Sequence, residues 1–266
     1  MDYITENKAA WEEAFAHRQP HWGEEVAERL QHEHLPFLDP AIVHQVEGLD
    51  LKDKVIAQFC CNNGRELLSL MQLGAAKGVG FDIATNILDQ ARQQAQAAHI
   101  TNCDFVAMNI LDIPETYHQQ FDFIIFTIGA ITWFKDLGPL FEKVAACLKP
   151  GGQLLLHDFH PFMNMLPLPD EAGFNAQDLH HLAYPYFNQA PFIEDEGMSY
   201  MSEHYHAQNR FTSFAHPTTA IINHLIATGL RLSQFDEYDY DVGLSNVYDG
   251  CGYPLSFLLM AEKPAN

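Results

Sequence analysis

Small and polar residues follow a short apolar run near residue 59, and their types suit the binding of a polar ligand. The segment reads Gln58-Phe59-Cys60-Cys61-Asn62-Asn63-Gly64 and leads into a helical pattern over Arg65 to Leu73. Asn and Gly tolerate the left-handed backbone of a tight turn. A strand that enters such a turn and continues as a helix directs backbone N–H groups and the positive helix end to one point. The segment therefore predicts a ligand-binding loop.

Two further polar side chains end the next two apolar runs. Asp82 ends Gly78-Val79-Gly80-Phe81-Asp82, near the spacing of roughly 20 residues after the loop at which a carboxylate grips a ribose diol. The alternative is that Asp82 only caps the next helix. Asn109 ends the third run, where its amide could read an adenine edge and Ile110 could stack on the ring. The order of these residues on successive runs predicts one nucleoside site.

The elements that must position these residues alternate between short apolar runs and amphipathic segments, which predicts an α/β fold. We expect a Rossmann-like, doubly wound and mostly parallel sheet. A helix over Pro217 to Thr228 is followed by two strand-like segments with no helix between them, which predicts an antiparallel C-terminal hairpin at the sheet edge. The predicted strands are Val55 to Phe59, Lys77 to Phe81, Cys103 to Met108, Phe121 to Thr127, Gln153 to His157, Leu230 to Tyr238 and Leu255 to Ala261.

The remaining segments predict a cap and an insertion within one structural domain. Residues 1–50 carry helical patterns over Asn7 to Ala16 and Glu24 to Gln31 and form the expected N-terminal helical cap. Residues 51–158 and 216–266 form the sheet domain. Residues 159–215 are rich in Pro, Tyr, Phe and His and form an insertion that we expect to act as a substrate lid. Within it, alternation over Ser199 to His206 predicts an exposed strand.

Charge and cysteine usage limit the partners and the compartment. The 266 residues include 35 Asp and Glu against 14 Lys and Arg, giving a net charge of −21. Such a surface repels phosphate backbones and anionic lipids, so we expect neither nucleic acid nor membrane as partner. The first residues lack the features of a signal peptide. Five cysteines, two of them adjacent, favour a reduced compartment, and we expect a cytoplasmic protein.

At these motifs the sequence resembles the class I S-adenosylmethionine-dependent methyltransferases, in particular a subgroup whose cofactor loop reads Leu-Gln-Cys-His-Phe-Gly. The segment from Phe59 to Gly64 follows that loop, with Cys61 at its cysteine. The resemblance covers roughly residues 50 to 162 and, more faintly, the C-terminal part. It continues through Gly80-Phe81-Asp82, Phe105 to Pro114, Phe121 to Trp133, Leu148-Lys149-Pro150-Gly151-Gly152, Asp158-Phe159-His160-Pro161, His216-Pro217 and Glu237-Tyr238-Asp239-Tyr240.

The resemblance implies S-adenosyl-L-methionine as cofactor and S-adenosyl-L-homocysteine as product. The implied contacts are Gln58, Cys60, Asn62 and Gly64 in the loop, Asp82 at the ribose, Ile83, Asn109 and Ile110 at the adenine, and Thr127, Ile128 and Gly129 beside the methionine moiety. The sequence departs from the family pattern at two places. The common Glu/Asp-x-Gly-x-Gly-x-Gly loop keeps only its last glycine, and Asn109 stands where Asp is usual, although an amide oxygen still accepts from an adenine amine.

Methyl transfer is an in-line displacement in which the protein mainly aligns the nucleophile, and a general base is needed only when that nucleophile carries a proton. The candidate bases are His160, His206 and His216. The string His157-Asp158-Phe159-His160 also suggests metal ligands. In a strand, however, neighbouring side chains point to opposite faces, so we expect no metal site.

The favoured hypothesis is O- or N-methylation of a small molecule. A non-catalytic S-adenosylmethionine-binding protein would keep the cofactor site but lack an acceptor pocket. A nicotinamide-dependent oxidoreductase would need a Gly-x-Gly-x-x-Gly loop, which the segment from Cys60 to Gly64 lacks. A protein acceptor is an open alternative, whereas the charge disfavours a nucleic acid. The sequence leaves the acceptor atom and the oligomeric state open.

Overall fold

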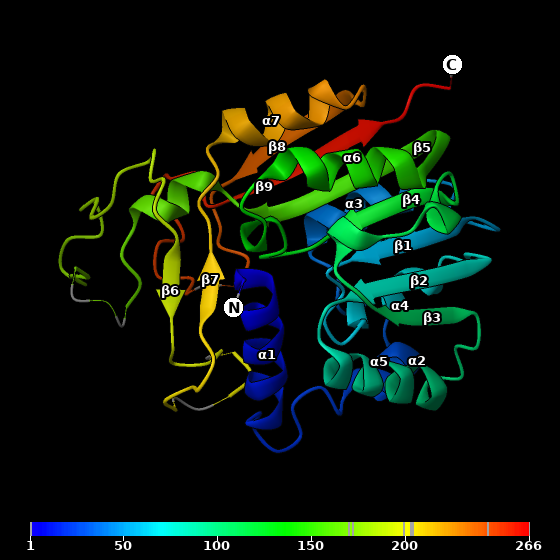
Figure 1. Ribbon diagram of the computed structural model, residues 1–266, viewed down its shortest axis with the longest axis horizontal. Helices are drawn as coiled ribbons and strands as arrows, with labels where there is room; N and C mark the ends of the chain where they lie inside the picture. Colours follow the sequence, from blue (N-terminus) through cyan, green and yellow to red (C-terminus); the bar gives the residue numbers. More distant parts are fainter. Residues whose placement is uncertain are drawn as a thin grey trace.

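The computed structural model describes residues 2–169, 171, 173–198, 200–202, 205–243 and 245–265. Their centre is a seven-stranded sheet in the order β3-β2-β1-β4-β5-β9-β8 (Figure 1). Strands β1 to β5 are parallel, and β9 runs antiparallel to both β5 and β8. The predicted α/β sheet with its C-terminal hairpin is therefore confirmed. The bounds are β1 Val55–Phe59, β2 Lys77–Asp82, β3 Cys103–Ala107, β4 Phe121–Phe126, β5 Leu148–Phe159, β8 Arg231–Tyr238 and β9 Ser256–Glu262.

Helices cover both faces of the sheet, which explains why its central strands read as apolar runs (Figure 1). In β4, Ile124 and Phe126 belong to the buried cluster that contains α6 and α7, whereas Phe123 and Ile125 belong to the cluster that contains α2 to α5. The alternation is the two-residue period of a strand. The helices are α1 Tyr3–Ala16, α2 Val26–His32, α3 Pro40–Glu47, α4 Arg65–Met71, α5 Thr85–Ala97, α6 Leu137–Cys147 and α7 Thr218–Ala227. None of the helices in the described ranges is long and apolar enough to cross a membrane.

Two local predictions differ from the structure. The strand predicted over Gln153 to His157 is part of a longer β5, which also contains Lys149 to Gly152, where the register with β4 shifts and Gly151 takes a φ of 77°. The strand expected over residues 199–206 does not form in its described part. Met201 and Ser202 are both buried, so adjacent side chains face the interior instead of alternating. Ser199 and His204 lie outside the described residues.

The insertion forms a two-stranded sheet of its own and is attached to the N-terminal helix. Strands β6 (Phe192–Glu194) and β7 (Phe211–Ser213) are antiparallel. The buried Asn7 side chain of α1 donates to the Thr212 carbonyl at 2.8 Å and accepts from the Thr212 N–H at 2.7 Å. Figure 1 shows α1 between β7 and the carboxyl edge of the large sheet. The N-terminal helix and the insertion therefore cover that edge together.

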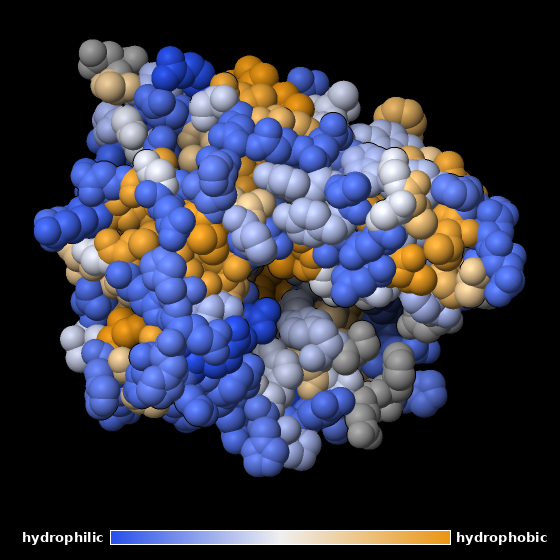
Figure 2. Space-filling model, turned by 180° about the vertical axis from the view of Figure 1, so that it is seen from behind, coloured by the Kyte–Doolittle hydropathy of each residue, from blue (hydrophilic) through white to orange (hydrophobic). Residues whose placement is uncertain are grey.

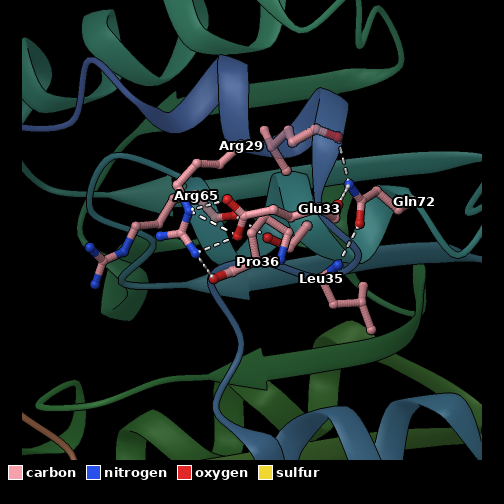
Figure 3. Close-up of polar contacts among 8 residues, drawn as sticks. Arg29, Glu33, Leu35, Pro36, Arg65 and Gln72 are labelled. Carbon is pink, nitrogen blue, oxygen red and sulfur yellow. Dashed lines mark hydrogen bonds and ion pairs between the residues drawn. The ribbon is translucent and has the colours of Figure 1, made fainter.

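A second junction fixes the chain after α2 to the C-terminal end of α4 (Figure 3). The Gln72 amide accepts from the Leu35 N–H at 2.7 Å and donates to the carbonyls of Leu30 and Glu33 at 2.8 and 3.1 Å. Arg29 binds Glu33 through two of its nitrogens and also donates to the Pro36 carbonyl. Because three backbone groups depend on one side chain, Gln72 connects the N-terminal cap to the sheet domain.

We expect Gln72→Ala to lower the free energy of unfolding by about 1 to 3 kcal/mol, since each lost hydrogen bond contributes about 0.5–1.5 kcal/mol. Urea unfolding followed by circular dichroism measures the loss. Gln93→Ala is the matched control, because Gln93 is exposed on α5. Equal stabilities for the two variants would show that the Gln72 contacts contribute nothing.

Candidate functional site

A cavity of about 920 Å³ lies where the parallel strands end, and α1 and the insertion contribute to its walls. The chain runs from β1 outward to β3 and then returns to β4, so the edge between β1 and β4 is the switch point at which such sheets bind ligands. All but two of the cofactor residues expected from the sequence line this cavity. The expected cofactor residues that line the cavity are Cys60, Asn62, Asp82, Ile83, Asn109, Ile110, Thr127, Ile128 and Gly129.

The loop after β1 takes its shape from three left-handed residues. Cys60, Asn62 and Gly64 have φ values of 56°, 49° and 74°. A Cβ on Gly64 would lie 2.4 Å from the Phe105 ring, so only glycine fits there. Gly64 thus closes the turn from behind and is not among the lining residues, while Cys60 and Asn62 face the cavity.

Gln58 is the other expected cofactor residue that is not among the lining residues. It is fully buried, its Oε1 accepts from the Leu67 N–H and its Nε2 donates to Thr127 Oγ1, both at 3.0 Å. The side chain therefore connects the first turn of α4 to the end of β4. Gln58 supports the two segments that line the cavity.

Asp82 has the geometry expected of a ribose-binding carboxylate. Its Oδ2 accepts from the Asn62 N–H at 2.8 Å, and its Oδ1 accepts from the Ala84 N–H at 3.0 Å. Burial raises the pKa of this carboxyl, and the backbone N–H groups partly oppose the rise. Each carboxylate oxygen has a second lone pair, so both can still accept from a ligand's hydroxyl groups. The capping and ribose-binding roles are therefore compatible.

Two amide side chains also line the cavity. Asn109 accepts from the Leu111 N–H and donates to Asp112 Oδ2, both at 3.1 Å, so it caps a short 3₁₀ turn and keeps one lone pair. Asn63 also lines the cavity and is 2% exposed, and its Nδ2 has no acceptor among the described residues. An unpaired buried donor is costly unless a ligand or water accepts from it. These donors and acceptors fit a polar, nucleoside-like ligand.

The loop after β4 is held by a buried carboxylate that the sequence suggested only as a metal ligand. Asp158 is fully buried, and its Oδ1 accepts from the N–H groups of Gly129 at 2.6 Å and Phe159 at 2.8 Å. Its Oδ2 lies 3.4 Å from the Ile131 N. Burial raises the pKa of this carboxyl to about 7 against the effect of these N–H groups. Asp158 thus determines the path of the segment that contains Gly129.

None of the three candidate histidines is among the residues that line the cavity. His160 accepts from the Phe162 N–H at 3.0 Å, and its Nε2 lies 3.0 Å from Glu237 Oε1. His216 donates from Nε2 to the Phe134 carbonyl at 2.8 Å. Burial lowers the pKa of both side chains. His206 is exposed.

The structure instead brings titratable side chains from the insertion to the cavity. Tyr184, Glu171 and Tyr200 line it, and Tyr200 accepts from Asn62 Nδ2 at 2.9 Å. Trp11 of α1 packs against Trp133 with ring centroids 5.3 Å apart, so the N-terminal cap supplies an aromatic wall. The sequence gives no signal that distinguishes these residues from ordinary packing residues, because they reach the cavity only through the way the insertion folds over the sheet.

Comparison with known proteins identifies one domain of the chain. Residues 42–152 match the family model described as a methyltransferase domain. A tRNA U34 carboxymethyltransferase of Helicobacter acinonychis is 30% identical over 107 residues, or 40% of each chain. A ribosomal protein L11 methyltransferase of Pseudomonas fluorescens is 31% identical over 115 residues, or 42% of this chain and 36% of that protein. The chain thus matches only about two fifths of the length of these relatives.

Solved structures resemble the fold over most of its length. An S-adenosylmethionine-dependent methyltransferase from Mesorhizobium loti has a TM-score of 0.63 at 16% identity, covering 86% of this chain and 99% of that one. A geranyl diphosphate C-methyltransferase from Streptomyces coelicolor, solved with S-adenosyl-L-homocysteine, has a TM-score of 0.59 at 12% identity and covers 99% and 98%. At these identities the likeness shows the fold alone. Over residues 42–152 the chain carries a methyltransferase domain, and its fold is shared with solved S-adenosylmethionine-dependent methyltransferases.

Proposed function

We propose that this protein transfers a methyl group from S-adenosyl-L-methionine to a small-molecule acceptor. The observation that carries the proposal is the cavity at the carboxyl edge of the sheet, because one cavity includes both the expected cofactor residues and side chains of the insertion. A cofactor-binding protein without catalysis needs only the first of these two sets. The second set supports an acceptor site next to the cofactor site.

The residues present fit the cofactor. Asp82 would hold the ribose hydroxyl groups, Ile83 and Ile110 would flank the adenine, and Thr127 and Gly129 would lie along the methionine part. When bound, S-adenosyl-L-methionine supplies the methyl group as an electrophilic carbon on a sulfonium. The chain's own contribution is to hold and align the acceptor and to exclude water, which in favourable systems is worth about 7–11 kcal/mol of the barrier.

Three observations favour a small acceptor over RNA or protein. The cavity is walled by α1 and by the insertion as well as by the sheet. The net charge is −21, and the face seen in Figure 2 is dominated by hydrophilic residues. A phosphate backbone needs a basic surface, which that charge opposes. The relatives whose names include tRNA or a ribosomal protein match only about two fifths of this chain, so they give little support to a macromolecular acceptor.

The test is isothermal titration of S-adenosyl-L-methionine and S-adenosyl-L-homocysteine into the purified protein. We expect both to bind with one site per chain, because the cavity holds a single set of cofactor residues. Absence of binding to well-folded protein would overturn the proposal. A short RNA hairpin titrated at 50 and 200 mM salt tests the acceptor class, and tight binding that weakens steeply with salt would favour a nucleic-acid acceptor.

A further inference from the structure

In the part of the cavity formed by the insertion, the carboxylate of Glu171 lies among apolar side chains. Glu171 lies on the same lining as Met163, Leu166 and Leu168. Its Oε2 accepts from the Leu168 N–H at 2.9 Å and from the Tyr184 hydroxyl at 3.0 Å. Glu171 Oε1 makes no hydrogen bond with the described residues. One oxygen is thus fixed in place while the other is left for a ligand.

Tyr184 orients this carboxylate. The Tyr184 hydroxyl donates to Glu171, and burial followed by the neighbouring carboxylate raises the pKa of Tyr184. A phenol with a raised pKa keeps its proton and continues to donate. The backbone of Tyr184 and Ala183 is held in turn by the Met165 carbonyl. The pair is therefore built into the fold of the insertion.

The charge of the lining indicates which acceptors the cavity accepts. Six lining residues are acidic, namely Glu66, Asp82, Glu171, Glu194, Asp195 and Glu196. Arg65 is the only Lys or Arg among the described lining residues, and its Nε lies 2.9 Å from Glu66 Oε1. An anionic acceptor would enter this field at an electrostatic cost, whereas a cation would be attracted. Aromatic rings such as Tyr184 and Phe192 on the same lining also suit a cation.

We propose that the acceptor is an amine on an apolar body, and that Glu171, oriented by Tyr184, binds its ammonium group and takes its proton. This inference rests on the proposed function. Glu171 accepts one proton from R–NH₃⁺, which leaves the nitrogen lone pair available. The lone pair forms the new C–N bond to the methyl carbon while the C–S bond breaks, and the C–S electron pair stays on sulfur as a neutral thioether. The product is R–NH₂⁺–CH₃, and the proton passes from Glu171 to water.

Binding to the protein loaded with S-adenosyl-L-homocysteine tests the inference without turnover. Titration calorimetry compares hexylamine, 1-hexanol and hexanoate, and then benzylamine, benzyl alcohol and benzoate. We expect the amine of each set to bind at least tenfold more tightly than its two partners. Glu171→Gln should weaken amine binding at least tenfold. Glu142→Gln removes the same charge from the exposed surface of α6 and should change nothing.

Kinetics with the better-bound amine and S-adenosyl-L-methionine distinguish the two residues. Glu171→Gln should lower kcat by about 100-fold or more, the usual effect of losing a general base. Tyr184→Phe should mainly raise KM, because it removes the orienting hydroxyl and leaves the carboxylate. Tighter binding of the carboxylates, no binding of either amine, or unchanged amine affinity in Glu171→Gln would each overturn the inference. Failure of the wild-type protein to bind S-adenosyl-L-homocysteine would instead overturn the proposed function.

Discussion

Asp82→Asn is expected to weaken the binding of S-adenosyl-L-homocysteine by about 100-fold, equivalent to about 2.8 kcal/mol. The carboxylate offers both oxygens to a ribose diol while it also accepts from the N–H groups of Asn62 and Ala84. An amide replaces one of these acceptors with a donor, so it loses a ligand hydrogen bond and a loop contact at the same position. Hydrogen bonds to charged groups are worth about 1.5–3 kcal/mol each. Isothermal titration measures the change in affinity.

The control for this variant is Asp89→Asn, which removes an equal charge from an exposed position on α5. Thermal unfolding separates a loss of affinity from a loss of structure. Because burial raises the pKa of Asp82, removing its charge relieves a desolvation cost, and we expect a melting temperature near that of the wild type. Undiminished affinity in Asp82→Asn would show that the ligand's ribose lies elsewhere.

The sheet could be predicted from the sequence because its strands are buried on both faces. The run over β4 is apolar at nearly every position, and β1 has the predicted bounds, Val55–Phe59. The helices were predicted less completely than the strands. Helix α3 was not predicted, although Asp39 caps it and Pro40 is its first residue, a combination typical of a helix start. A window of eight residues gave too little periodicity to reveal it.

The site was predictable in part for a related reason. Residues at strand ends, such as Asp82 and Thr127, meet at one edge whatever the side-chain details, so their spacing alone brought them together. The direction in which a single side chain points could not be predicted from this spacing. Gln58 lies at the end of β1 but turns inward to Leu67 and Thr127. The histidines were chosen for their chemistry, whereas Glu171 reaches the cavity only because the insertion folds back over the sheet.

The largest effect on folding is expected from the carboxylate of Asp158. Asp158→Ala leaves the N–H groups of Gly129, Ile131 and Phe159 without their acceptor in the interior. Each buried unsatisfied donor costs about 1–3 kcal/mol, so the free energy of unfolding should fall by about 3 kcal/mol or more. Urea unfolding measures this loss. Since the same N–H groups shape the loop that contains Gly129, cofactor affinity should also fall. Asp158→Asn keeps Oδ1 and its two shortest hydrogen bonds and should recover most of both losses.

A comparison of the wild type with Asp158→Asn also tests the ionisation of Asp158. Its pKa of about 7 in the folded protein exceeds the 3.8 of an unperturbed Asp, so between these values the folded state holds a proton that the unfolded state has lost. The stability contributed by Asp158 is therefore complete below the lower pKa and is lost as pH rises through the higher one. From pH 5.5 to 8, the stability of the wild type relative to Asp158→Asn should fall by about 2 kcal/mol. Partial or full burial lowers the pKa values of His157, His160 and His216, which act in the opposite direction, but these residues are present in both proteins and cancel in the difference. A difference that stays constant with pH would show that Asp158 is ionised throughout this range.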